Sequence, residues 1–340
     1  MTTSNPIQLI YAGGTFGSHG KPLAPLAADI LLPNLLSQLK QKYSYHLKVL
    51  KNTCIKDSSQ LNPSDLVHFY TLILNEYKNG SRQFVLITGT DTLSYLGAFL
   101  AEAFAGSDVC ILLTASMKPL FDSDICKHYQ IDKNSDAWGN ITQAIQFASK
   151  DVTGIYTCLS DKVWLAQSVQ KIDSHALLAF TGTPAASTNN LYLSDNEKST
   201  WLTTHASFTS SVIQQAHNVN VSVIYTVPND ASFLAQQIEQ ALDDNKPSAL
   251  IIMGFGAGNI PHSIMLEKVL DTKADAGHLI VATTQCPFGG VSDDYAAGSW
   301  QYQHQVLSGG KLTVPAIYAR LLWLLLTTDV TKRHKKWKSQ

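Results

Sequence analysis

The apolar run IQLIYA (residues 7–12) passes directly into a glycine-rich loop that contains GGT (13–15). A second apolar run, QFVLIT (83–88), passes in the same way into GTDT (89–92). Short segments of this apolar density are typical of strands buried on both faces of a parallel sheet. Ligands of such sheets bind beyond the carboxyl ends of the strands. Both threonine-containing loops are therefore predicted to lie at the ligand-binding edge of one sheet.

The rest of the chain repeats this alternation of short apolar segments and helical patterns. Strands are also predicted at 46–51, 109–114, 154–159, 222–227, 248–253 and 278–284, and helices at 27–42, 63–77, 92–105, 135–150, 231–242 and 314–326. The pattern predicts an α/β fold, with a parallel sheet covered by helices in a larger N-terminal domain and a smaller C-terminal α/β domain. The polar, Ser/Thr-rich stretch between them is interpreted as a linker with a hairpin. The expected division is a catalytic domain at 1–188, a linker at 189–218 and a second domain at 219–340.

The composition limits the classes of partner. The 340 residues carry a formal net charge of −1, and Lys and Arg are dispersed outside the tail KRHKKWK (332–338), which is interpreted as a solvated C-terminus. A nucleic-acid partner is therefore not expected. No apolar stretch reaches the 18 residues that a membrane span needs, so no membrane partner is expected either.

The cysteines and the N-terminus indicate the compartment. The five cysteines form no C-x-x-C pair, so neither a metal site nor a disulfide framework is predicted. The first residues, MTTSNPIQ, lack the basic and apolar regions of a signal peptide. We expect a cytoplasmic protein with reduced thiols and no metal.

Taken alone, the threonine motifs have two interpretations each. The GGT loop lacks the third glycine of a dinucleotide fingerprint and the lysine of a P-loop, so it indicates a turn. Thr90-Asp91-Thr92 opens a predicted helix and fits an N-cap with an acid in the first turn. The chemical interpretation is that a hydroxyl there orients water or acts as a nucleophile, while the carboxylate binds a substrate ammonium. Lys171 could serve as a base near such an acid, although a lone lysine is more often solvated.

Two other motifs point to different enzymes and are incomplete. GFGAGN (254–259) resembles a nucleotide loop, but Asn259 stands where the third glycine is needed. SVQK (168–171) and SDN (194–196) match two elements of the penicillin-recognising serine acylases, and the third element, K-T-G, is missing. No organic cofactor is expected.

Eight stretches in this order resemble the bacterial-type L-asparaginase family, and most of all its cytoplasmic type I branch. They are YAGGTFG (11–17), DSSQLNPSDL (57–66), ITGTDTLSYLGAFL (87–100), LLTASMKPL (112–120), SDAWGNITQA (135–144), SVQK (168–171), GFGAGNIP (254–261) and TTQC (283–286). The resemblance covers nearly the whole chain and implies a two-domain α/β fold without metal or cofactor.

The resemblance also implies residue roles. Thr15 matches the nucleophilic threonine of a mobile loop, and Thr90, Asp91 and Lys171 match a second triad in which Asp91 also holds the substrate ammonium. The implied substrate-binding residues are Gly14, Ser59, Gln60, Gly89, Ser116 and Asn259. Asn259 matches a residue that a neighbouring subunit contributes, so a homodimer or homotetramer is implied.

The activity implied by the resemblance is hydrolysis of L-asparagine, an amino-acid amide, to L-aspartate and ammonia. The family carries a tyrosine about ten residues beyond the first threonine, where this chain has Leu23, with His19 as a candidate replacement. The segment 118–135 is longer than in the family, and Ala137 stands in place of a glycine. A glutaminase or other ω-amidase, or a weakened relative that binds amino acids, therefore remains an alternative.

Overall fold

The computed structural model describes residues 6–122, 129–150, 152–185, 191–292 and 296–339. Contacts within the chain divide it into two compact units, Met1–Thr209 and Ser210–Gln340. Each unit is built around its own sheet.

The first unit contains a six-stranded sheet in the order β4-β1-β5-β6-β7-β8. The strands are β1 (Ile7–Tyr11), β4 (Leu47–Val49), β5 (Gln83–Ile87), β6 (Cys110–Thr114), β7 (Gly154–Leu159) and β8 (Lys162–Leu165). All neighbours pair in parallel except β7 and β8, which are antiparallel. The predicted strands at 7–12 and 83–88 are therefore direct neighbours, with Leu9 opposite Val85.

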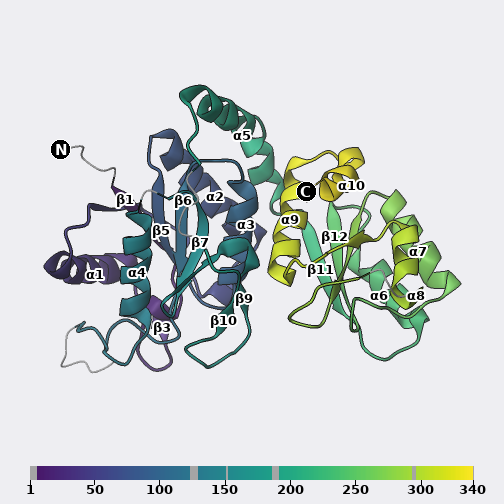
Figure 1. The fold of residues 1–340 in the computed structure, drawn as a ribbon, viewed down its shortest axis with the longest axis horizontal. Helices are drawn as coiled ribbons and strands as arrows, with labels where there is room; N and C mark the ends of the chain where they lie inside the picture. The colour runs from purple at the N-terminus through teal and green to yellow at the C-terminus, as the bar shows by residue number, and fades with distance from the viewer. Residues whose placement is uncertain (1–5, 123–128, 151, 186–190, 293–295, 340) are drawn as a thin grey trace. The chain divides into compact units, whose positions relative to one another are not determined.

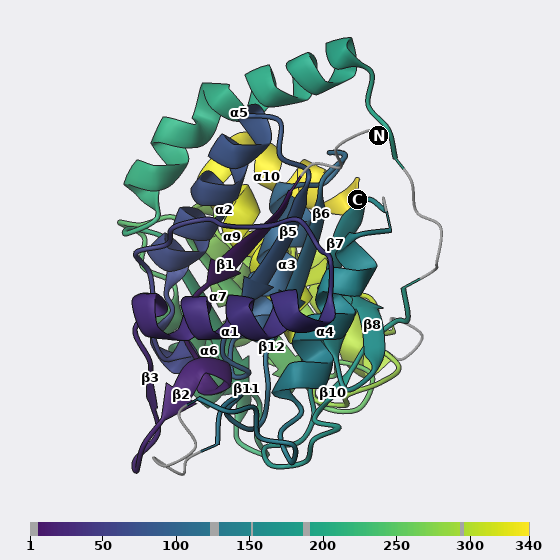
Figure 2. The ribbon, with the colours of Figure 1, turned by 90° about the vertical axis from the view of Figure 1, so that its left-hand side faces the viewer.

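Helices cover both faces of this sheet, as its apolar strands predict. The helices α1 (Ala28–Lys42) and α4 (Ala137–Ala148) lie on one face, and α2 (Pro63–Lys78) and α3 (Leu93–Ala103) lie on the other (Figures 1 and 2). Leu35 of α1 and Ile141 of α4 share one buried core with Leu9, Val85 and Leu112 of the strands. The predicted parallel sheet with helical layers is confirmed for this unit.

Short elements follow the strand ends of the first unit. They are the 3-10 turns Thr15–Gly17, Ser58–Gln60 and Ala166–Ser168, and the small antiparallel pairs β2 (Ser18–His19) with β3 (Ala24–Pro25) and β9 (Gln170–Lys171) with β10 (Phe180–Thr181). Of the predicted site residues, these segments carry Thr15, Ser59, Gln60 and Lys171.

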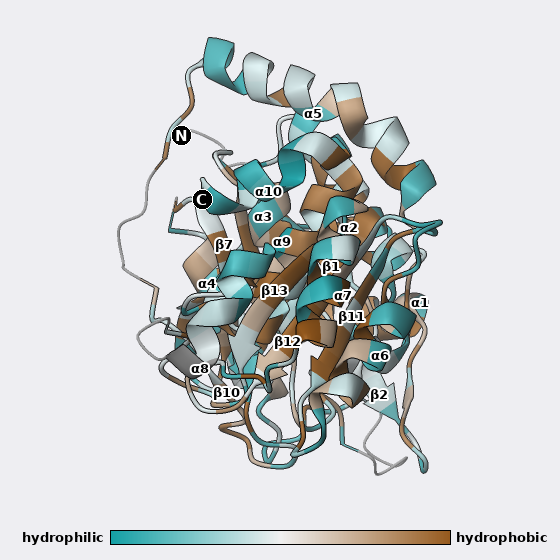
Figure 3. Ribbon diagram, turned by 90° about the vertical axis from the view of Figure 1, so that its right-hand side faces the viewer, coloured by the Kyte–Doolittle hydropathy of each residue, from teal (hydrophilic) through white to brown (hydrophobic). Residues whose placement is uncertain are grey.

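The second unit is a smaller parallel α/β layer structure, as predicted. Its strands are β11 (Asn220–Tyr225), β12 (Ser248–Gly254), β13 (Leu279–Thr284) and β14 (Leu307–Ser308), and its helices are α6 (Ala231–Ala241), α7 (Ile264–Asp275), α8 (Ala296–Ser299), α9 (Val314–Thr327) and α10 (Val330–Lys338), with a 3-10 turn at Trp300–His304. In Figure 3 the strands β12 and β13 are hydrophobic, whereas α6 and α7 in front of them carry hydrophilic residues on their outer sides. Leu234 and Leu270 of these helices pack on Leu250 and Ile280 of the sheet.

Two predictions about polar segments were wrong. Most of the expected linker with a hairpin is the helix α5 (Asp195–Gln215), and the division between the units falls inside it. The expected solvated tail is α10, in which Arg333 and Trp337 are buried. The long segment at 118–135 is described only in part, because residues 123–128 lie outside the described ranges.

Tertiary contacts explain why α5 forms in spite of its polar composition. The Trp201 ring stacks on Phe104, and its Nε1–H donates to the carbonyl of Ala105 at 3.0 Å. His205 stacks on Trp201 with ring centroids 3.6 Å apart, and its Nδ1 lies 2.9 Å from the hydroxyl of Tyr70. A few aromatic anchors thus outweigh weak helix propensity.

Among the described residues no helix combines the length and apolarity that crossing a bilayer requires. The same residues form no group of three or more His, Cys, Asp or Glu side chains able to hold a metal ion.

Acid should weaken the docking of α5. Burial lowers the pKa of His205 to about 4, whereas an unfolded histidine titrates near about 6.5. Between about pH 4 and pH 6.5 the folded chain binds fewer protons at His205 than the unfolded chain does. The contribution of this group to stability is therefore complete above that range and is lost as the pH falls through it. We expect wild type to lose about 2 kcal/mol of unfolding free energy between pH 7 and pH 5 from this group, and His205→Gln to lose less. Urea titrations followed by tryptophan fluorescence measure the difference; an equal loss in both proteins would contradict the assignment.

Candidate active site

The two threonine loops contact each other through glycine backbone. Gly13 and Gly14 follow β1 with φ of 98° and 82°, and Gly89 follows β5. A Cβ placed on Gly14 would lie 2.2 Å from Cα of Gly89, and one placed on Gly13 would lie 2.1 Å from the carbonyl oxygen of Lys56. Only glycine combines the positive φ with this closeness. The bare backbone therefore brings Thr15 and Thr90 to one edge of the sheet.

A third segment joins them through Ser58. A Cβ on Gly89 would lie 2.3 Å from Oγ of Ser58. The Oγ1–H of Thr92 donates to the carbonyl of Ser58 at 2.8 Å, and the backbone N–H of Asp91 donates to Oγ of Ser58 at 3.3 Å. The Ser58–Gln60 turn begins at Asp57, whose carboxylate accepts from the backbone N–H and the hydroxyl of Ser59. Segments that follow β1, β4 and β5 therefore form one tightly packed edge.

Lys171 reaches this edge from the antiparallel part of the unit. It lies on β9, opposite Phe180 of β10. Its Nζ donates to Oγ1 of Thr90 at 3.0 Å and to Oδ1 of Asp91 at 2.8 Å. The lysine side chain is 22% exposed and that of Asp91 is 57% exposed. An ammonium, a hydroxyl and a carboxylate are thus in direct contact, with the carboxylate open to solvent.

These groups line one small polar cavity of about 190 Å³. Its lining residues are Gly14, Thr15, Asp57, Ser58, Gly89, Thr90, Asp91, Met117, Lys171 and Ser174. The volume is below the range of about 300–1,000 Å³ that is common for drug-sized ligands. Among the described residues, the hydroxyl of Thr15 makes no hydrogen bond, whereas that of Thr90 accepts from Lys171. The cavity is therefore small, and both threonines line it.

The structure brings together six of the predicted site residues and leaves four outside the cavity. Gly14, Thr15, Gly89, Thr90, Asp91 and Lys171 line it. Ser59 and Gln60 are exposed on the 3-10 turn, and Ser116 is fully buried with its hydroxyl donating to the carbonyl of Lys118. Asn259 belongs to the second unit, in the loop after β12.

Four lining residues were not predicted: Asp57, Ser58, Met117 and Ser174. Asp57 and Ser58 stand immediately before the predicted Ser59, in the stretch DSSQ. The sequence therefore indicated the right segment but not the side chains that line the cavity.

The carboxylate of Asp136, at the start of α4, accepts the backbone N–H of Met117 at 3.0 Å and that of Lys118 at 3.1 Å. This contact fixes the turn at Met117.

Leu23 and His19 do not line the cavity. Leu23 lies between β2 and β3 and is 53% exposed. His19 lies on β2 with its ring 6.5 Å from that of Tyr129. Neither side chain supports Thr15 through a hydrogen bond in the described part of the chain.

Comparison with known proteins establishes the family. Residues 6–206 match the family model "Asparaginase, N-terminal", and residues 220–337 match "Glutaminase/Asparaginase C-terminal domain". The chain belongs to the asparaginase family. The predicted two-domain fold and membership of an amide-hydrolase family are therefore confirmed.

Individual relatives are distant and span nearly the whole chain. An L-asparaginase of Thermococcus kodakarensis is 27% identical over 92% of this chain and 90% of its own length. L-asparaginase 1 of Escherichia coli is 22% identical over 98% of this chain and 96% of its own length, and a glutamyl-tRNA(Gln) amidotransferase component of Methanobrevibacter smithii is 24% identical over 95% and 72%. The crystal structure of L-asparaginase I from Vibrio cholerae has the same fold, with a TM-score of 0.74 at 20% identity over 99% of this chain and 97% of that one.

The glycine contact can be tested with a matched pair of substitutions. Gly14→Ala should lower stability by more than the about 1–2 kcal/mol that a positive φ alone costs, because its methyl group meets the Gly89 backbone, and the cavity should lose its geometry. Gly80→Ala is the control, since Gly80 has a φ of 97° with open space around its Cβ position. Thermal unfolding and ligand-binding assays compare the two. Equal behaviour of the two variants would show that the loop contact is unimportant.

Proposed function

We propose that this protein hydrolyses the side-chain amide of L-asparagine to give L-aspartate and ammonia. The observation that carries the proposal is the contact of Lys171 with both Thr90 and Asp91, at 3.0 and 2.8 Å, in the cavity that Thr15 also lines. Amide hydrolysis needs an oxygen nucleophile, donors for the oxyanion and a proton for the leaving ammonia. The cavity supplies candidate groups for each need.

The proposed roles follow from the contacts. The open carboxylate of Asp91 pairs with the α-ammonium of the substrate while it orients Lys171. The ammonium of Lys171 donates to the oxygen of Thr90 and stabilises negative charge that develops there while a proton passes to the leaving nitrogen. Thr15 lines the same cavity and contacts the same ligand.

Two routes are chemically balanced. In the covalent route the oxygen of Thr15 attacks the amide carbon, the C–N bond breaks, and the hydroxyl proton leaves with ammonia; water then cleaves the threonine ester. In the direct route water oriented by Thr90 attacks the same carbon, and its proton passes through Lys171 to the departing nitrogen. The covalent route needs Thr15 as the nucleophile, the direct route needs Thr90 and Lys171, and Asp91 binds the substrate ammonium in both.

The small cavity favours asparagine over glutamine. One additional methylene in a tight pocket changes transition-state binding by about 1–3 kcal/mol. We therefore expect kcat/KM to be higher for asparagine, with glutamine and other ω-amides as slower substrates.

Ammonia release from a panel of amino-acid amides tests the proposal. Thr90→Val and Lys171→Met should each lower kcat by about 10² or more, as single-group deletions in oxyanion and relay sites do elsewhere. Thr15→Val should do the same if the route is covalent, and a trapped ester seen by mass spectrometry on rapid quenching would identify it. Thr272→Val is the control, because the hydroxyl of Thr272 donates to the carbonyl of Lys268 within α7 of the second unit and does not line the cavity.

The result decides between the enzyme and the binding alternative. Tight calorimetric binding of asparagine to wild type without turnover would support an amino-acid-binding relative and would reject the enzyme. Turnover of glutamine alone would replace asparagine as the substrate.

We also propose that the active form is a homodimer or homotetramer in which Asn259 completes the cavity of a neighbouring copy. All described residues that line the cavity belong to the first unit, whereas Asn259 belongs to the second. Closed symmetric assemblies make such sharing reciprocal. Among the described residues, Cys54, Cys110, Cys158 and Cys286 form no disulfide, which fits a reducing compartment, and we propose the cytoplasm.

Subunit complementation tests the shared site. Lys171→Met and Asn259→Ala should each be inactive alone, and a mixture refolded together should recover part of the wild-type rate, because a hybrid oligomer contains an intact pair. Native mass spectrometry confirms that hybrids form. If hybrids form without recovery, the two residues do not act in one site across subunits.

A further inference from the structure

We infer that Lys56 and Asp65 are positioning residues for the cavity: their ion pair holds segment 52–58 against the loops that carry Thr15 and Thr90. Neither Lys56 nor Asp65 lines the cavity. The kinetic part of the inference rests on the proposed function, and its structural part does not.

Asp65 is a buried residue of helix α2 whose carboxylate connects this helix to segment 52–58. Its carboxylate accepts two hydrogen bonds from Nζ of Lys56, at 2.8 and 2.9 Å, and one from the thiol of Cys54 at 3.3 Å. It also accepts the backbone N–H of Asn62 at 3.0 Å, which completes the capping box of α2. Burial raises the pKa of Asp65, but the hydrogen bonds from Lys56, Asn62 and Cys54 outweigh it and hold the pKa below its usual value. The carboxylate is therefore charged and fully engaged.

The thiol of Cys54 acts here as a neutral donor. Burial and the neighbouring Asp65 raise its pKa to about 11. At neutral pH the sulfur therefore keeps its proton, which points to the Asp65 carboxylate.

The backbone of Lys56 is in contact with the loop that carries Thr15. Its N–H donates to the carbonyl of Ala12 at 3.1 Å, and Gly13 and Lys56 form an isolated β-bridge. Its carbonyl oxygen leaves no room for a Cβ on Gly13. Any movement of Lys56 would therefore displace Ala12 and Gly13, the two residues that precede Gly14.

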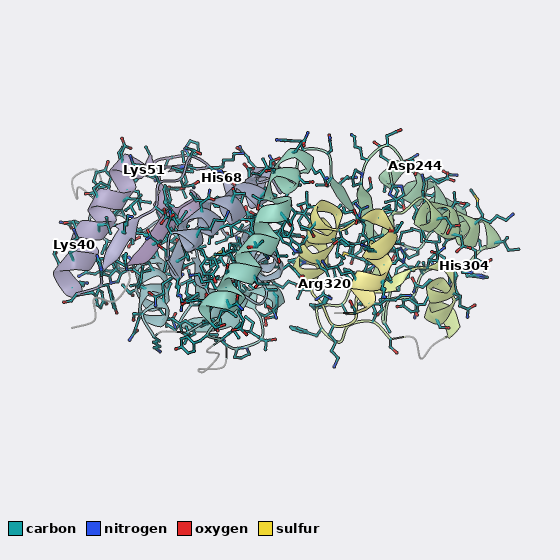
Figure 4. The ribbon with its side chains drawn as sticks, turned by 90° about the horizontal axis from the view of Figure 1, so that it is seen from above. Lys40, Lys51, His68, Asp244, His304 and Arg320 are labelled. Carbon is teal, nitrogen blue, oxygen red and sulfur yellow. The ribbon has the colours of Figure 1, made fainter. Side chains whose placement is uncertain are left out.

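A second tie strengthens the same junction. Nδ2 of Asn52 donates to the carbonyl of Tyr11, the last residue of β1, at 2.9 Å and to that of Cys54 at 2.7 Å. The ring of His68, labelled on α2 in Figure 4, lies with its Nε2 2.8 Å from Oδ1 of Asn52. Helix α2 thus contacts segment 52–58 at two points, Asp65 and His68.

Segment 52–58 ends at Ser58, which packs on Gly89 and hydrogen-bonds to Asp91 and Thr92. The ion pair therefore acts on both threonine loops, through Gly13 on one side and Ser58 on the other. Shifts of about 1 Å in a catalytic geometry can cost about 10²-fold in rate, so loss of the pair should reach the chemistry without any contact to substrate.

The experiment compares Lys56→Met with Arg82→Met. Lys56 and Arg82 are matched cations: their side chains are 35% and 36% exposed, and each pairs with a largely buried aspartate at 2.8 Å. Arg82 immediately precedes β5, at the opposite end of the sheet from the cavity. Lys56→Met leaves the capping box of α2 intact, and Lys56→Gln serves as a second variant if the first does not fold.

At a temperature well below unfolding, Lys56→Met should lower kcat/KM for asparagine by about 10-fold or more, and Lys56→Arg should restore most of it. Arg82→Met should lower the melting temperature and leave kcat/KM within about 2-fold of wild type. A merely structural role for Lys56 would give the same pattern as Arg82→Met. That result, or the absence of rescue by arginine, would overturn the inference.

Hydrogen exchange separates this inference from the proposed function. Amides of residues 12–17 and 56–60 should exchange faster in Lys56→Met than in wild type, with no such change in Arg82→Met. If wild type releases no ammonia, the proposed function fails and the exchange result alone decides the positioning role. Unchanged exchange in Lys56→Met would reject it.

Discussion

The active-site edge depends on one steric condition, the absence of a Cβ at positions 14 and 89. Parallel strands β1 and β5 bring two chain segments to neighbouring positions, but ordinary residues there would keep the loops a side chain apart. With glycine at both positions the backbones touch, and the next residue in each loop is a threonine. Thr15 and Thr90 then line one cavity. A close approach of backbone is a typical use of glycine at ligand sites.

The charges of the site come from outside the parallel strands. Lys171 is supplied by a short antiparallel pair, and Lys56 by the loop after β4. Each lysine contacts an aspartate of another segment at 2.8 Å, and the two pairs differ in exposure. The Asp91 carboxylate is 57% exposed and has room for a further donor, whereas Asp65 is 12% exposed and saturated with donors. Removing one member of a buried ion pair leaves an uncompensated charge. The buried pair Lys56–Asp65 therefore suits a fixed support, and the open pair Lys171–Asp91 suits a binding group.

The strands and the loops after β1 and β5 could be predicted from sequence because their signal is local. Apolar density over five or six residues followed by glycine indicates a buried strand and its turn. This local signal places the loops of Thr15 and Thr90 at the ends of two strands. The contact of Lys171 with Thr90 is not local, since 81 positions separate the residues, and only the resemblance of SVQK to a family motif placed it there. Helix α5 could not be predicted because its anchors, Trp201 and His205, stabilise it through partners on other helices rather than through its own sequence. The tail was misjudged for the same reason, as its charges hide the burial of Trp337.

Several of the segments that the resemblance singles out do reach the cavity, whereas the side chains that line it differ in part from those expected. The DSSQ stretch was expected at the substrate and does reach the cavity, but on a 3-10 turn successive side chains point in different directions. Ser58 is therefore buried beside Gly89, while Ser59 turns outward to Asp57. The same holds at the loop after β6, where Met117 lines the cavity and the predicted Ser116 is fully buried, with its hydroxyl donating to the carbonyl of Lys118. A motif predicts which loop forms part of a cavity. The geometry of the turn then determines which side chains of that loop line it.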